Sequence, residues 1–148
     1  MAANYIANAD INGLIGTARR ELLFTEPGGS YSATEQTRCV EIASAIVKSN
    51  AHNAGYTGLG DTTTNDQIVA LSLRVFLELA YARKGEKVPE GLVTNFPTLD
   101  DLRTGKLGLT GLAPAERDAV GGSYFSESST SVTDASVQVF TRAEQNRY

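Results

Sequence analysis

The chain has 148 residues, 41% of them hydrophobic and 20% charged, with a formal net charge of −4 and a pI near 5.0. This composition fits a globular protein with one core and excludes a disordered chain. Basic residues are scattered, so the sequence shows no electrostatic footprint for gripping DNA. With no secretory signal at the start and no transmembrane run, we expect a protein made and kept, or assembled, in the cytoplasm.

Two helices are predicted in the first third of the chain. Asp10 precedes a series at helical spacing, which predicts a short helix over about residues 10–23: Ile11, Leu14, Ile15, Ala18 and Leu22. A Pro-Gly-Gly stretch at 27–29 then forces a loop. Ser32 and Glu35 fit a capping box at the start of a long helix that ends by Gly55. Its predicted apolar stripe consists of Cys39, Ile42, Ala43, Ile46 and Val47.

The next predicted helix begins with Asp66 as its cap and reaches Arg83 or Lys84. Its apolar residues cover most of the circumference, so neighbouring helices or neighbouring subunits have to cover it on several sides. A charge placed at Phe76 should therefore unfold the domain.

Thr98 and Asp101 offer another box-like cap, for a short helix that ends near Gly105. Residues 106–112 are apolar but too short to classify by pattern. Together these patterns predict a mainly α protein: a small bundle of about four helices over residues 1–113, followed by an extended C-terminal arm over 114–148.

The arm changes in composition. Residues 121–136 are dominated by Gly, Ser and Thr, with too few apolar side chains to offset an ordering entropy of about 1 to 2 kcal/mol per residue. Yet Val137, Val139, Phe140 and Tyr148 follow in an alternating pattern that favours a strand. We interpret 114–148 as a docking arm that orders on a partner's surface or sheet edge. The alternative is a frayed terminus without consequence.

No motif in the sequence predicts catalysis, a cofactor or a metal. One cysteine, Cys39, excludes an internal disulfide framework, and one histidine, His52, excludes a site of several imidazoles. These two residues are 13 positions apart, about 20 Å along one helix, too far for a nucleophile and its base. Asp100 and Asp101 are adjacent and suit a helix start.

The glycines at 55, 58 and 60 follow a helix and lack the Lys-Ser/Thr of a phosphate loop. Asp61, Asn65 and Asp66 lack the spacing of a calcium loop.

Four segments in this order resemble the Mu-like head-tail connectors of tailed phages, also called adaptors or head-completion proteins. They are residues 5–11 (YIANADI), the helix containing 40–46 (VEIASAI), the helix 68–83, and the closing 139–142 (VFTR). The likeness covers nearly the whole chain and is one of pattern. Where the family commonly has a basic stretch with tyrosine and proline between its main helices, this chain has Gly-Leu-Gly-Asp at 58–61.

The resemblance implies a virion protein of the neck. It implies a ring of roughly twelve copies with head-to-tail interfaces, with the over-apolar helix 68–82 shielding part of its surface between subunits. One face would meet the portal protein and the other the tail terminator or the stopper or next neck protein. DNA would pass without specific binding, and no membrane is involved. The residues implied to grasp the portal are Val137, Val139, Phe140, Thr141, Arg142 and Tyr148.

Two other classes of function remain open from the residues alone. A small helical protein-binding or regulatory module would form a defined complex with a small partner. An unrecognised enzyme would require a deep pocket with perturbed titratable groups.

Overall fold

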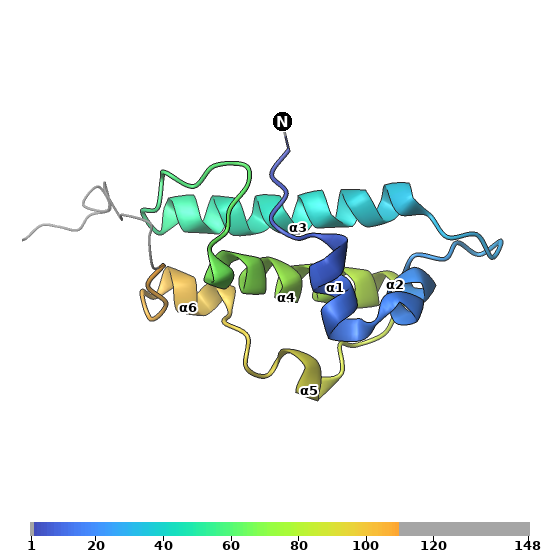
Figure 1. The fold of residues 1–148 in the computed structure, drawn as a ribbon. Helices are drawn as coiled ribbons and strands as arrows, with labels where there is room; N and C mark the ends of the chain where they lie inside the picture. Colours follow the sequence, from blue (N-terminus) through green and yellow to red (C-terminus); the bar gives the residue numbers. More distant parts are fainter. Residues whose placement is uncertain (1, 110–148) are drawn as a thin grey trace, which may run out of the picture.

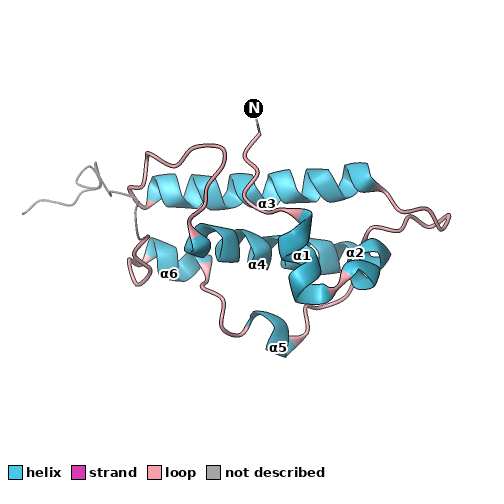
Figure 2. Cartoon of the chain, in the orientation of Figure 1, coloured by secondary structure: helices cyan, strands magenta, loops and turns pink. Residues whose placement is uncertain are grey.

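The computed structural model describes residues 2–109, which form a bundle around two long antiparallel helices (Figure 1). These are α3 (Ala33–Asn53) and α4 (Asp66–Arg83), and they pack side by side along their length. The described part contains helices and loops (Figure 2), apart from one isolated antiparallel bridge between Thr25 and Tyr31. The prediction of a mainly α fold is confirmed. The predicted arm, residues 114–148, and the boundary at 113 lie outside the described residues.

The first predicted helix is two helices, α1 (Asn8–Ile15) and α2 (Thr17–Leu23). Gly16 separates them with a φ of +83°, a left-handed conformation that glycine adopts without a steric penalty. Asp10 is not the cap; it lies in the first turn, where its carboxylate accepts a hydrogen bond from the Ala7 N–H at 2.8 Å. The turn at Gly16 also directs Leu23 into the core and leaves Leu22 54% exposed, so the single apolar stripe was wrong.

Helix α3 begins where the sequence predicted. Ser32 Oγ accepts a hydrogen bond from the Glu35 N–H at 3.2 Å. The Glu35 carboxylate does not complete the capping box; it faces Arg38 and Arg83, each at 3.8 Å. Ile42 is 43% exposed, so its assignment to the buried stripe was wrong. The residues that do face the core are Gln36, Cys39, Val40, Ala43, Ser44, Val47 and Ala51.

Helix α4 is the centre of the core. Asn65 is its N-cap in place of Asp66, because Asn65 Oδ1 accepts from the N–H groups of Gln67 and Ile68 at 3.0 and 3.2 Å. Half of the helix is buried: Ile68, Leu71, Ser72, Leu73, Val75, Phe76, Leu77, Ala80 and Tyr81. The Phe76 ring stacks on Phe24, with 5.7 Å between centroids.

The cover of α4 comes from the helices of this chain. Helix α3 lies along one side, α2 packs near one end, and Leu102 of α6 joins the same core. The only large apolar side chains exposed in the described residues are Leu22, Tyr31 and Ile42, none of which belongs to α4. Neighbouring helices of the same chain therefore supply most of the cover that α4 needs, and the shielding of its partly buried residues, such as Val69 and Leu79, between subunits stays a prediction.

Two short helices complete the described chain, α5 (Glu90–Val93) and α6 (Leu99–Arg103). The sequence did not predict α5. The box at the start of α6 is confirmed: Thr98 Oγ1 accepts from the Asp101 N–H at 3.1 Å, and Asp101 Oδ2 accepts from the Thr98 N–H at 3.0 Å. The Thr98 N–H and the Thr98 hydroxyl both donate to the Asp101 carboxylate and lower its pKa. Leu109 is buried in the core after α6.

Candidate functional site

The single cysteine and the single histidine lie on α3, on different faces. Cys39 is buried against α4, with Sγ 4.0 Å from the Phe76 carbonyl oxygen. Burial raises the pKa of its thiol to about 11, so little thiolate is present at neutral pH. His52 is exposed in the last turn of α3. Because α3 is continuous, the two side chains do not meet.

The loop between α3 and α4 uses its polar residues to hold the fold together. Asp61 accepts a hydrogen bond from Lys48 Nζ at 2.7 Å, and this ammonium group holds the pKa of the carboxyl below its usual range. Asn65 caps α4, and Asp66 lies in the first turn of that helix. The described residues contain no group of three or more His, Cys, Asp or Glu that could hold a metal ion.

The N-terminal segment lies against this loop. The Asn4 N–H donates to the Asp61 carbonyl at 2.8 Å, and the Tyr5 hydroxyl donates to the Gly60 carbonyl at 2.6 Å. The Tyr5 N–H also donates to Ser44 Oγ of α3 at 3.0 Å. Burial, helped by the charge of Asp61, raises the pKa of Tyr5 to about 12. The segment is thus tied to both α3 and the loop.

Between the N-terminal segment and the loop lies a groove of about 460 Å³, which we call the 4–7/62–64 groove. It is lined by residues 4–7 on one side and residues 62–64 on the other. Val69 contributes apolar surface beside the buried Ile6, while Asp10 and Asp66 contribute carboxylates. Neither carboxylate forms an ion pair within the described part of the chain.

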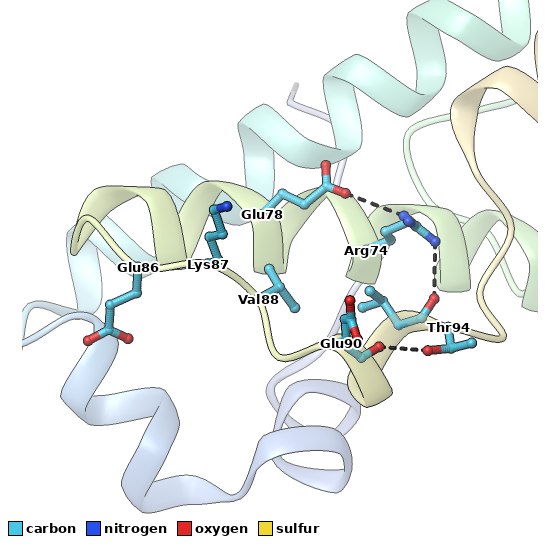
Figure 3. A pocket seen from close by; sticks show the side chains of 8 residues that line it. Arg74, Glu78, Glu86, Lys87, Val88, Glu90 and Thr94 are labelled. Atoms are coloured by element: carbon cyan, nitrogen blue, oxygen red, sulfur yellow. Dashed lines mark hydrogen bonds and ion pairs between the residues drawn. The ribbon is translucent and has the colours of Figure 1, made fainter.

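A second hollow, of about 490 Å³, lies between α4, the segment that follows it, and α5 (Figure 3). Its lining is mostly charged: Arg74, Glu78, Glu86, Lys87, Val88, Glu90, Val93 and Thr94. Several of these charges are already paired. Glu86 pairs with Arg19 of α2, and Glu78 with Arg74 at 3.3 Å.

Arg74 holds the two sides of this hollow together. Its Nη1 donates to the carbonyls of Val93 and Phe96, at 3.0 and 3.1 Å, and so ties α4 to α5 and the turn that follows. The sequence pattern did not predict this role. A signal was present nevertheless, because Arg74 is the one basic residue within the apolar series 68–82.

The predicted portal-binding residues, from Val137 to Tyr148, lie outside the described residues, so the structure brings none of them together. Comparison with known proteins adds no assignment: no family model, no curated protein and no solved structure matches the chain. No helix within residues 2–109 is long and apolar enough to cross a membrane. The described chain is a small helical domain with open grooves on its surface.

Proposed function

We propose that the chain is a structural virion protein: a head-tail connector that joins the portal to the next neck or tail protein as part of a ring. One contrast within the chain carries this proposal. The described domain covers its core with its own helices, whereas the next group of apolar residues in the sequence lies far beyond the domain. Helix α4 finds its cover within residues 2–109. Val137, Val139 and Phe140 follow a stretch rich in Gly, Ser and Thr.

This arrangement suits an adaptor. A domain that buries its own apolar faces can serve as a rigid ring element, and an arm with alternating apolar residues can add to a sheet edge of the portal. The net charge of −4 suits a conduit through which DNA passes without binding. The resemblance in segment order to Mu-like connectors supports the same function, with the assembled protein in the neck of the virion.

The proposal is tested by co-expressing the full chain with the portal protein encoded in the same viral genome and purifying the complex. We expect the two proteins to co-purify as a ring visible by electron microscopy. The double variant Val139→Asp, Phe140→Asp should lose the portal while keeping its helical circular dichroism. The matched control, Ser128→Asp, Ser129→Asp, places the same charges in the Gly/Ser/Thr stretch and should retain the portal.

Portal binding by the double variant at the level of the control would contradict the arm assignment. A stable complex of one copy with a single small protein outside the virion would support the helical binding or regulatory module in place of a connector.

A further inference from the structure

The 4–7/62–64 groove has an open backbone edge. The backbone N–H and C=O groups of Thr62, Thr63 and Thr64 form no hydrogen bond within the part of the chain that the structure describes. Val69 is half-buried and lines the groove as apolar surface, whereas Ile6 is buried in the core and exposes little. An extended segment with unpaired backbone groups next to apolar surface is the kind of site to which a peptide adds as a strand.

We propose that residues 137–142 of this same chain dock in the 4–7/62–64 groove before assembly, and that a partner must displace them. The inference rests on the proposed function, in which these residues later bind the portal. A free strand with alternating apolar residues is prone to pair with other copies and aggregate, so a cover within the subunit protects it. Phe140 and Arg142 lie on one face of such a strand, and Phe140 would meet Val69.

The chain leaves the domain close to the groove. Lys48 of α3 donates a hydrogen bond to Asp61 in the loop between α3 and α4, which we call the groove loop. Asn50, two residues further along α3, accepts a hydrogen bond from Arg103 of α6 at 2.8 Å. The groove loop and α6 are therefore held to the same end of α3. Residues 110–136 form a connection of 27 residues. A Gly/Ser-rich linker of this length has an r.m.s. span of about 30 Å, similar to the length of α3.

The charges of the groove also favour residues 137–142 as its occupant. Asp10 and Asp66 line the groove without an ion pair among the described residues. Arg142 follows Phe140 by two residues, about 7 Å along the same face of a strand, and can meet one of these carboxylates. The arm thus offers apolar and basic groups to an apolar and acidic groove.

The test is disulfide trapping in the full chain without any partner. Thr64→Cys and Val139→Cys are introduced together, because Thr64 is exposed and its side chain forms no hydrogen bond in the described structure. The native Cys39 is buried and does not compete. The matched control pairs Val139→Cys with Ser49→Cys, an exposed residue near the same end of α3.

We expect the Thr64 pair to form an intramolecular disulfide at least about fivefold faster than the Ser49 pair, because docking raises the effective concentration at one site only. Arg142→Glu should reduce this excess, whereas Arg147→Glu should leave it. Equal rates for the two pairs would overturn the proposal. Disulfide-linked dimers in place of the intramolecular product would also overturn it, since a second copy would then occupy the groove.

The result is separable from the proposed function. Trapping is measured on the free chain, so failure to trap leaves portal binding untouched, and failure to bind the portal leaves the trapping result valid. When both hold, added portal should lower the rate of trapping for the Thr64 pair and leave the rate of the Ser49 pair unchanged.

Discussion

The two long helices are similar in length and differ in how they are used. Helix α4 is buried on several sides, and its exposed positions, such as Glu78, lie in a narrow strip. Helix α3 buries one face and exposes Arg38, Ile42, Ala45 and Ser49 on the other. The difference shows that α4 is the element around which the domain folds, whereas α3 covers it and presents a surface to solvent.

The largest effect is expected for Phe76→Asp, compared with Ile42→Asp on α3. Phe76 is fully buried against Phe24, so an unpaired carboxylate there should cost more than the about 3 to 5 kcal/mol of a Phe→Ala change and unfold the domain. Ile42 is exposed, and its replacement should change the free energy of unfolding by about 1 kcal/mol or less. Circular dichroism with urea unfolding measures both. A folded Phe76→Asp variant would contradict the central place of α4.

The alkylation rate of Cys39 is a second measure of how α3 packs against α4. Its pKa of about 11 should make alkylation by iodoacetamide about a hundredfold slower than for an exposed thiol. The rate should rise strongly in the milder variant Phe76→Ala and stay low in Ile42→Ala. Equal rates in these two variants would show that the α3–α4 contact does not protect the thiol.

Arg74→Met should lower the free energy of unfolding by about 1 to 3 kcal/mol, because α4 loses its charged hydrogen bonds to the Val93 and Phe96 carbonyls. Methionine keeps the aliphatic packing of the side chain. Lys87→Met in the same hollow, whose side chain forms no hydrogen bond in the described structure, should stay within about 0.5 kcal/mol of the unmodified chain. Faster hydrogen exchange over residues 90–96 in Arg74→Met alone would locate the effect. A loss of similar size in both variants would contradict the assigned role of Arg74.

The caps of the two helices should differ in strength. Asn65 accepts two backbone hydrogen bonds at the start of α4, whereas Ser32 accepts one at the start of α3. We expect Asn65→Ala to lower the free energy of unfolding by about 1 to 2 kcal/mol and Ser32→Ala by about 0.5 to 1 kcal/mol. Ser49→Ala, at an exposed position within α3, is the control for helix propensity. A larger loss for Ser32→Ala than for Asn65→Ala would show that the second hydrogen bond of the Asn65 cap adds no stability.

The smallest effect concerns the attachment of α3 to the groove loop. The pKa of Asp61 is lowered in the folded chain by Lys48, so the pair stabilises the fold above the unfolded pKa of about 4 and stops doing so as the pH falls through the folded pKa. Asp61→Asn should therefore lower the urea midpoint at pH 7 and have no effect near pH 2. Glu90→Gln, which removes a carboxylate without an ion pair in the described chain, should show no such pH dependence. An Asp61→Asn midpoint shifted equally at both pH values would contradict the ionic contribution of the pair.

Elements with local signals could be predicted from the sequence. The periodicity of residues 66–83, the Ser32 cap and the Thr98–Asp101 box each depend on neighbours a few positions away, and each is present in the structure. The prediction that α4 must be covered on several sides followed from its composition in the same way. What covers it did not follow, because that depends on residues distant in sequence.

Features that depend on such distant contacts could not be predicted from the sequence. Gly16 divides the first predicted helix because the turn lets Leu23 and Phe24 reach the core. The spacing of apolar residues along the sequence does not predict this break. The outward position of Ile42 and the tie of Arg74 to two carbonyls likewise depend on how helices pack. The 4–7/62–64 groove exists because Tyr5 meets Ser44 and Gly60, residues 39 and 55 positions away along the chain.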